Sequence, residues 1–213
     1  MSSGVLVSSG VLEFAEVVRR RRMVRNYDPD RAVPAAVRDR ILRHALRAPS
    51  AGFSQGWAFL VLESAAERAR FWAVTAPDDS TPAKPSRWLA RMSTAPLVIV
   101  PLSHRDAYLD RYAEPDKGWT DRDEARWPVP YWHIDTGFAA LLMLLTAVDE
   151  DLGACFFGIP PERIGAFRGE FGVPGEYTPI GAITVGYRAA DPPSPSLRRG
   201  HRRFDDVIHH GHW

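Results

Sequence analysis

Residues 133–152 read HIDTGFAALLMLLTAVDEDL and contain the most apolar stretch of a chain of 213 residues. In a helix, the large apolar side chains of this segment would point to every side. They are Ile134, Phe138, Leu141, Leu142, Met143, Leu144, Leu145 and Val148. A helix that is apolar all round is buried all round. Because a chain of this length builds about one domain, we expect a central helix that is partly covered by a second subunit.

The remaining composition predicts a soluble, cytoplasmic protein without a membrane partner. The most apolar residues, 137–148, are too few to cross a bilayer, and the acidic run 149–151 ends them. Residues 1–10 are small and apolar but lack a basic region, which predicts a flexible tail rather than a signal peptide. The single cysteine, Cys155, excludes an intramolecular disulfide and is typical of a reducing compartment.

Helices and strands alternate on both sides of the apolar segment. Periodicity, capping residues and breakers predict four helices besides the central one: 11–23, 34–48, one from the capping box at 64–67 to about 76, and one from 160–161 through 171. The expected strands are 57–62, 97–102, 154–157 and 180–187. This mixture indicates an α/β or α+β fold. Since no repeat and no clear linker interrupts it, we expect one domain over 1–213.

Two segments lack clear periodicity. Residues 101–133 are rich in Asp, Arg, Trp and Pro, which predicts a long loop or a lid-like excursion. The sequence leaves two interpretations open for its aromatic side chains, which cover a ligand or a partner surface or simply pin this segment to the body: Trp119, Trp127, Tyr131 and Trp132. The tail, 190–213, is rich in Pro, Ser and Arg, and we expect it to contribute to a binding site or a dimer.

A cluster of arginines follows the first helix, with the sequence RRRRMVR over residues 19–25. The chain as a whole is nearly neutral, since 27 Lys and Arg face 26 Asp and Glu. A local concentration of guanidinium groups therefore indicates a compact anion, and a phosphate ester matches the guanidinium fork best. Arg21, Arg22 and Arg25 would share one helix face, whereas Arg19 and Arg20 would be solvated.

Two other interpretations of the arginines stay open at this point. The cluster is a solvated helix face in a chain that prefers arginine, or it binds nucleic acid. Nucleic-acid binding fits less well, because the isoelectric point of about 8.0 lies below the values above ~9 typical of such domains. No G-x-G-x-x-G and no P-loop motif occurs, so a phosphate here would be held by side chains.

A second polar segment, APSAGFSQGW over residues 48–57, joins the second helix to the first strand. Its small residues let a planar ligand lie close to the backbone, and Ser50, Ser54 and Gln55 offer hydrogen-bond donors and acceptors. Taken by itself, it is equally compatible with an ordinary loop.

Four segments, in order, resemble the nitroreductase family of flavoproteins. The family's first helix ends in a pattern like R-R-S-x-R-x-F/Y, which residues 21–27 match. A segment like A-P-S-x-x-N-x-Q-P-W is matched by 48–57, and a long apolar helix with a following glycine loop by 133–158. A basic residue before a segment like P-L-E-E-V-V-H is matched by 203–209. The resemblance spans nearly the whole chain, from 11 to 213.

The resemblance implies an α+β fold, with a mostly antiparallel central sheet flanked by helices and the long helix at a homodimer interface. It also implies one FMN per interface, with both subunits contributing. The residues implied to bind it are Arg21, Arg22, Met23, Arg25 and Arg203 at the phosphate and ribityl chain, Pro49, Ser50, Ala51 and Gln55 of the partner chain along the isoalloxazine, and the backbone of Phe157 and Gly158 at the reactive edge.

The implied activity is an FMN-dependent oxidoreductase that transfers a hydride from NADH or NADPH to a nitro compound, a quinone or a similar small acceptor by a ping-pong mechanism. This chemistry belongs to the cofactor, so we assign no catalytic side chain and no metal. The alternatives are a specialised relative (flavin-fragmenting, dehalogenating or deazaflavin-binding) and a non-catalytic flavin-binding protein.

Three positions depart from the family's pattern: Met23 replaces its Ser, Phe53 its Asn and Gly56 its Pro. Met23 removes a hydroxyl near the phosphate, and Phe53 cannot hydrogen-bond the flavin's pyrimidine edge. Two other features have simpler interpretations. We expect Cys155 to be a packing residue rather than a reactive thiol, and we assign no metal to the three terminal histidines because no other ligand type has the spacing of a metal site.

Overall fold

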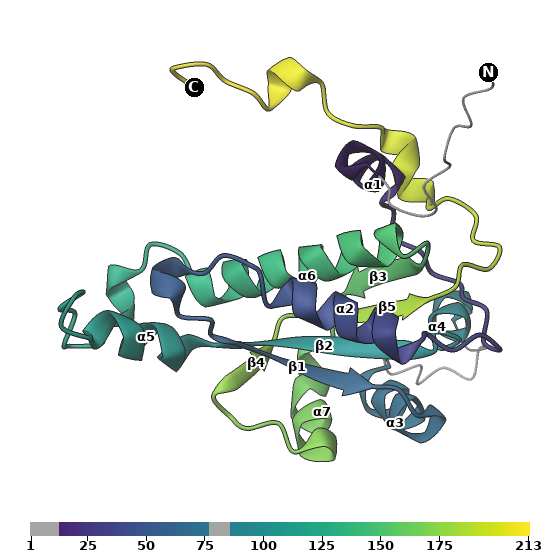
Figure 1. The fold of residues 1–213 in the computed structure, drawn as a ribbon, viewed down its shortest axis with the longest axis horizontal. Helices are drawn as coiled ribbons and strands as arrows, with labels where there is room; N and C mark the ends of the chain where they lie inside the picture. The colour runs from purple at the N-terminus through teal and green to yellow at the C-terminus, as the bar shows by residue number, and fades with distance from the viewer. Residues whose placement is uncertain (1–12, 77–85) are drawn as a thin grey trace, which may run out of the picture.

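Five antiparallel strands form the centre of the computed structural model, which describes residues 13–76 and 86–213 (Figure 1). The strands are β1 (Trp57–Leu62), β2 (Leu97–His104), β3 (Gly153–Phe157), β4 (Tyr177–Pro179) and β5 (Ala182–Gly186). Their order is β1-β2-β5-β3, and the short β4 pairs with the far end of β2. The predicted α+β fold with a mostly antiparallel sheet is confirmed.

Alternation along the buried strand β2 supplies both faces of the sheet. Leu97 and Ile99 belong to one apolar cluster, while Val98 and Val100 belong to another on the opposite face. All four side chains are at most 1 % exposed. A strand with apolar residues at every position is therefore covered on both faces, as its sequence predicts.

The first face is covered by α6 (Tyr131–Asp149) and α2 (Ala35–Ala45). Met143 of α6 and Ile41 of α2 are fully buried against the sheet. The short α1 (Phe14–Arg20) packs on α6. The apolar helix predicted at 133–152 is therefore the central one, although it begins two residues earlier and ends at Asp149.

The second face is covered by α3 (Ala65–Thr75), α4 (Arg87–Met92) and α7 (Ile164–Phe171) (Figure 1). The predicted capping box opens α3: the Ser64 hydroxyl accepts from the Glu67 N–H at 3.1 Å, and Glu67 Oε2 accepts from the Ser64 N–H at 2.9 Å. Aromatic rings of Phe71 and Phe167, whose centroids lie 6.2 Å apart, join α3 to α7.

The predicted loop over 101–133 was wrong in part. Residues up to His104 belong to β2, and α5 (Arg105–Ala113) follows at once. The reason is that Tyr108 and Leu109 give this polar segment a buried side, which the surrounding Arg and Asp residues conceal in the sequence. A short 3-10 turn, η2, covers Glu124–Arg126.

The aromatic residues of this excursion pack on one another. The Trp127 ring lies 4.6 Å from Tyr112, 5.6 Å from Trp119 and 5.6 Å from Tyr131, measured between centroids. The indole therefore pins the excursion to α5 and to the start of α6. Of the two interpretations left open by the sequence, these contacts agree with the second, in which the aromatic side chains attach the segment to the body.

Other boundaries differ from the prediction by a few residues. The first helix ends at Arg20 rather than at Met23, and its predicted start at 11–12 lies outside the described residues, as does the tail 1–10. The remaining 3-10 turns are η1 (Ala51–Phe53), η3 (Pro161–Arg163), η4 (Pro195–Arg199) and η5 (Phe204–Asp206). From 200 onward the C-terminal segment extends away from the body, and all its residues are exposed (Figure 1).

Within the described part of the chain, α6 is the one helix that is long and apolar enough to cross a membrane by length and composition. It is longer than the stretch 137–148 that the sequence singled out. Because 56 % of its window is buried inside the protein, its apolar character is that of a core helix.

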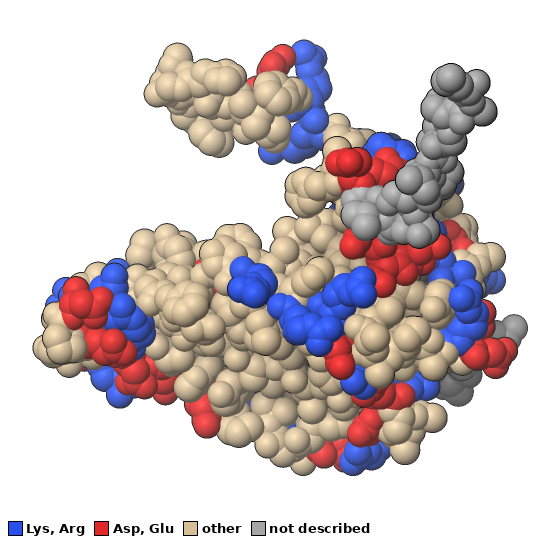
Figure 2. Space-filling view, in the orientation of Figure 1, with Lys and Arg blue, Asp and Glu red and all other residues tan. Residues whose placement is uncertain are grey.

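One side of α6 stays uncovered in the single chain. Ile134, Phe138 and Leu141 are 37 %, 43 % and 45 % exposed. Their spacing of i, i+4 and i+7 places them on one stripe of the helix, which we call the α6 stripe. In Figure 2 the surface above α6, between the excursion and the C-terminal segment, is largely uncharged.

Candidate functional site

Residues 21–25, which we call the arginine segment, leave α1 and run in extended conformation beside the edge strand β3. Met23 forms a parallel bridge with Ala154, and the Val24 N–H donates to the Ala154 carbonyl at 2.9 Å. The expectation that Arg21, Arg22 and Arg25 share one helix face is therefore wrong. Pairing with β3 satisfies the backbone and buries Val24 to 1 % exposure, which further helical turns would prevent.

Tyr27 and Gly153 hold this segment in place. The buried Tyr27 hydroxyl donates to the Val24 carbonyl at 2.5 Å, and burial raises the pKa of that hydroxyl. Gly153 lies directly beneath the segment, where a Cβ atom would approach the Val24 side chain to 2.8 Å. The close approach of the arginine segment to β3 thus requires glycine at 153.

The arginines nevertheless converge on one cavity of about 530 Å³, which we call the arginine cavity. Its walls come from the arginine segment and from the chain that follows β5. They are Arg21, Arg22, Met23, Arg25, Asp191, Pro193, Ser194, Ser196, Leu197 and His201. Four of the predicted site residues are thereby brought together, by an extended strand rather than by a helix face.

Asp191 is the one carboxylate lining this cavity. Its side chain is 5 % exposed and accepts from the Arg25 backbone N–H at 2.9 Å and from Arg22 Nη1 at 3.1 Å. Among the described residues, the Arg21 guanidinium makes no hydrogen bond or ion pair. Because three guanidinium groups face one carboxylate, the cavity keeps a net positive charge.

The two arginines before this segment have other partners. Arg19 pairs with Glu16 at 2.6 Å on the exposed side of α1, and Arg20 pairs with Asp151 at 2.9 Å. Neither lines the arginine cavity. This fits the interpretation that only the later arginines are available for a ligand.

Arg203 does not reach the arginine cavity within one chain. It lies at the start of η5, in the C-terminal segment that extends away from the body (Figure 1). The predicted phosphate clamp of Arg203 with Arg21, Arg22 and Arg25 is therefore not formed by a single copy. Of the segment from 200 onward, His201 lines the cavity, and all its residues are exposed.

The Pro49–Gln55 region is held at the other end of α6. The Ala51 N–H donates to Asp135 Oδ2 at 2.8 Å, and the Gln55 N–H donates to Ser50 Oγ at 3.0 Å. Pro49 and Ser50 directly precede η1, in which Gly52 has a φ of 61°. Gly56 allows close contact with the Tyr108 ring, since a Cβ there would come within 2.5 Å of it.

Asp135 was not identified from the sequence, although a carboxylate inside an apolar helix itself indicates a buried polar contact. It is 3 % exposed and also accepts from the Tyr108 hydroxyl at 2.8 Å. Burial, together with this hydrogen bond to Asp135, raises the pKa of Tyr108. Asp135 therefore ties α5 and the loop before β1 to the start of α6.

The two polar segments of one chain lie at opposite ends of α6. Arg20, next to the arginine segment, pairs with Asp151 just beyond the end of the helix, whereas Ala51 is bonded to Asp135 in its second turn. A helix of 19 residues is about 28 Å long. A single copy therefore does not bring Ser50 and Gln55 to the arginine cavity.

Phe157 and Gly158 lie at the far end of β3, on the side of α3 and α4. The Phe157 ring stacks on Trp72 with 5.6 Å between centroids, and Trp88 meets it edge-on at 5.5 Å. Gly158 lines a small cleft beside Trp72 and Trp88. A further hollow of about 440 Å³ adjoins both regions, because it shares Arg25 with the arginine cavity and Trp88 with this cleft.

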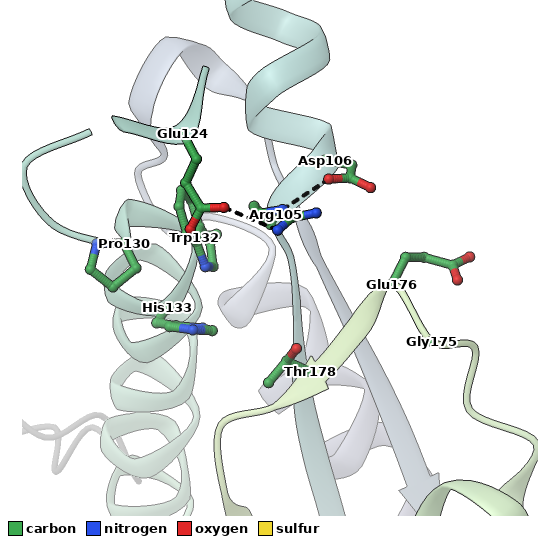
Figure 3. A pocket seen from close by; sticks show the side chains of 9 residues that line it. All are labelled: Arg105, Asp106, Glu124, Pro130, Trp132, His133, Gly175, Glu176 and Thr178. Carbon is green, nitrogen blue, oxygen red and sulfur yellow. Dashed lines mark hydrogen bonds and ion pairs between the residues drawn. The ribbon is translucent and has the colours of Figure 1, made fainter. Parts of the chain in front are cut away.

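A separate polar pocket of about 480 Å³ lies at the start of α6 (Figure 3). His133 Nδ1 is 2.8 Å from Ser103 Oγ, which in turn donates to the Thr178 carbonyl at 3.2 Å. Which of the two atoms donates in the His133–Ser103 contact depends on the tautomer of the imidazole. Burial lowers the pKa of His133.

Two of the three acidic side chains that line this pocket pair with its arginine. Arg105 contacts Asp106 and Glu124, each at 3.0 Å (Figure 3). The pocket shares no lining residue with the arginine cavity, and sequence reasoning did not identify it. No group of three metal-ligating side chains is close enough to hold an ion in the part of the chain that the structure describes.

Cys155 is 2 % exposed, in the second apolar cluster. Burial raises the pKa of its thiol to about 11. Both facts agree with a packing role rather than a reactive thiol.

Comparison with known sequences decides the family. A sequence model described as "Nitroreductase family" matches residues 18–187. The chain belongs to the nitroreductase family. The predicted resemblance, drawn from four short segments, is confirmed over most of the described fold.

Similar nitroreductase-family proteins cover the chain almost completely. A protein of Methanothermobacter thermautotrophicus named "Putative NADH dehydrogenase/NAD(P)H nitroreductase" is 28 % identical over 95 % of this chain and 88 % of its own. A solved nitroreductase structure from Exiguobacterium sibiricum, in complex with FMN, has a TM-score of 0.71 at 20 % identity and covers 94 % of this chain and 98 % of its own. Another FMN complex, from Desulfovibrio desulfuricans, has a TM-score of 0.68 at 22 % identity and covers 92 % and 95 %.

Proposed function

We propose that this nitroreductase-family protein is an FMN-dependent oxidoreductase, which transfers a hydride from NADH or NADPH to a small acceptor such as a nitro compound or a quinone. The observation that carries the proposal is the convergence of Arg21, Arg22 and Arg25 on one cavity with a net positive charge. The names of similar proteins, and the FMN bound in two solved relatives, support the same assignment.

The arginine cavity fits a phosphate ester. A flavin phosphate carries about −1.5 to −2 charge, and guanidinium groups bind such oxygens two at a time. Arg21 has no other partner among the described residues, and Asp191 fixes the backbone of Arg25 so that its side chain lines the cavity. Met23 supplies an apolar wall where the family's Ser would offer a hydroxyl.

The chemistry itself comes from the flavin, which accepts and returns a hydride when it is bound. The protein's residues bind and orient the cofactor and exclude water from it. Gly158 lines the cleft beside Trp72 and Trp88, and an added Cβ atom there would meet no described atom within 4 Å. We assign no catalytic side chain.

We further propose that the protein works as a homodimer through the α6 stripe. Exposed Phe138 and Leu141 would be covered by the same stripe of a second copy, as in an isologous two-fold interface. If the two α6 helices run antiparallel, Ser50 and Gln55 of one copy lie near the arginine cavity of the other. This arrangement joins two half-sites that lie at opposite ends of α6 in one chain.

The C-terminal segment has the character of a strap for a second copy. Phe204 and Trp213 are 68 % and 97 % exposed, which is unusual for aromatic residues on a surface that no partner covers. If this segment crosses to a second copy, it carries Arg203 toward that copy's arginines. This is how the predicted four-arginine site would be completed.

The test is the colour of the purified protein and its response to reductant. We expect flavin absorbance that is bleached by NADH or NADPH without oxygen and restored when an acceptor is added. A flavin that stays oxidised with both nicotinamides would favour the specialised or non-catalytic alternatives. Colourless protein that takes up no added FMN would contradict the proposal.

A further inference from the structure

The hollow of about 440 Å³ next to the arginine cavity has its own basic and aromatic lining. We call it the α4 hollow, because its distinctive residues come from α4. It is lined by Arg25, Arg87, Trp88, Arg91, Asp191, Pro192, Pro193, Ser194 and Pro195. None of these α4 residues was singled out from the sequence.

The charges of the α4 hollow are unbalanced. Arg87 and Arg91 are spaced i, i+4, so they lie on the same side of α4. Neither guanidinium contacts a carboxylate among the described residues, and the only acid of the lining, Asp191, is committed to the arginine segment. An anionic group in the hollow would therefore find two arginines without a competing partner.

Trp88 adds an aromatic surface to the same hollow. Edge contacts with Trp72 at 6.3 Å and with Phe157 at 5.5 Å fix its ring. The residue is still 36 % exposed, which is high for an indole held in this way. A fixed, partly exposed indole beside arginines suits a planar ring that carries phosphate, such as a nucleotide.

The position of the hollow connects it to the proposed flavin site. It shares Arg25 and Asp191 with the arginine cavity and Trp88 with the cleft at Gly158. A nucleotide bound there would thus border both the proposed phosphate site and the ring end of the flavin. The nicotinamide donor is the nucleotide that the proposed function requires at this place.

We propose that the α4 hollow binds the adenosine end of the nicotinamide donor, and that Arg87 and Arg91 select NADPH over NADH by holding the 2′-phosphate. The inference rests on the proposed function. Its chemical basis is that the two donors differ only in this phosphate, for which arginine is the usual partner. Trp88 would stack on the adenine, which both donors share.

The kinetic test uses the flavin-loaded protein and compares kcat/KM for NADPH and NADH. We expect the wild type to prefer NADPH, and Arg87→Ala or Arg91→Ala to lower kcat/KM for NADPH about tenfold, as the loss of a charged hydrogen bond predicts. The value for NADH should change less than about twofold, and Arg91→Lys should restore part of the loss. Arg43→Ala, which removes an exposed arginine of α2, is the matched control.

A binding test separates this inference from the proposed function. Adenosine 2′,5′-bisphosphate should bind the wild type more tightly than adenosine 5′-monophosphate does, and Arg87→Ala should abolish the difference without changing flavin content. The inference would be overturned if Arg87→Ala and Arg91→Ala lowered kcat/KM equally for NADPH and NADH. It would also be overturned if both variants bound adenosine 2′,5′-bisphosphate as tightly as the wild type does. Loss of flavin from these variants would instead assign the hollow to the flavin's own phosphate. If the protein holds no flavin at all, the proposed function fails, and the bisphosphate measurement still decides the hollow.

Discussion

Asp191 accepts a hydrogen bond from the backbone N–H of Arg25 at 2.9 Å, across 166 positions of sequence. This contact joins the chain after β5 to the arginine segment and places the carboxylate between the arginine cavity and the α4 hollow. The two regions on which the functional proposals rest are thus built around one buried acid.

Replacing Asp191 tests the contribution of its hydrogen bond with the Arg25 N–H to stability. We expect Asp191→Ala to lower the free energy of unfolding by about 1–3 kcal/mol, because a part-buried N–H loses its partner. Asp191→Asn keeps an acceptor for the Arg25 N–H and should cost clearly less. Urea unfolding of the two variants measures both effects, and equal losses would mean that the charge, rather than the hydrogen bond, holds the segment.

A charge on the α6 stripe tests the dimer. Phe138→Glu places a carboxylate where an apolar interface is proposed, and an unpaired buried charge costs several kcal/mol. We expect a folded monomer with reduced flavin content by analytical ultracentrifugation and absorbance. Ala69→Glu, on the exposed side of α3, is the control. A Phe138→Glu protein that stays dimeric with full flavin would contradict the proposed interface.

His133 predicts a pH-dependent stability. Its pKa is lowered from 6.5 in the folded protein, so near and below that value the unfolded chain binds a proton that the folded chain excludes. The stability contribution is therefore present above pH 6.5 and is lost as the pH falls toward the folded pKa. His133→Asn, whose amide can still form a hydrogen bond with Ser103, should flatten the curve of unfolding free energy against pH, and an unchanged slope would exclude His133 as its cause.

Cys155 should be unreactive in the folded protein. With a pKa of about 11, about one thiol in a thousand is ionised near pH 8, and the side chain is buried. A thiol reagent such as Ellman's should therefore label the protein slowly until denaturant is added. Rapid native labelling would show that the site opens.

Much of this architecture could be predicted from the sequence because the deciding signals are local. Three of these signals depend on residues within a few positions of one another: the capping box at Ser64 and Glu67, the apolar runs of β1 and β2, and the apolar sequence of α6. The family followed from four short motifs. The helix α5 was missed because its buried Tyr108 and Leu109 stand among charged residues.

The candidate site was harder to predict because it depends on distant pairings. The arginine segment is extended because β3 offers it an edge and Gly153 gives it room. Asp135 and Asp191 act through partners 84 and 166 positions away. No local sequence pattern near either acid predicts those partners.

The flavin content of one double variant tests the central claim most directly. Arg21→Ala with Arg25→Ala removes two of the three guanidinium groups of the arginine cavity, while Arg19→Ala with Arg43→Ala removes the same charge elsewhere. We expect the first protein to be a folded dimer whose FMN affinity is lowered about a hundredfold or more, and the second to keep its flavin. Full flavin occupancy in the Arg21→Ala, Arg25→Ala protein would contradict the assignment of this cavity to the flavin phosphate.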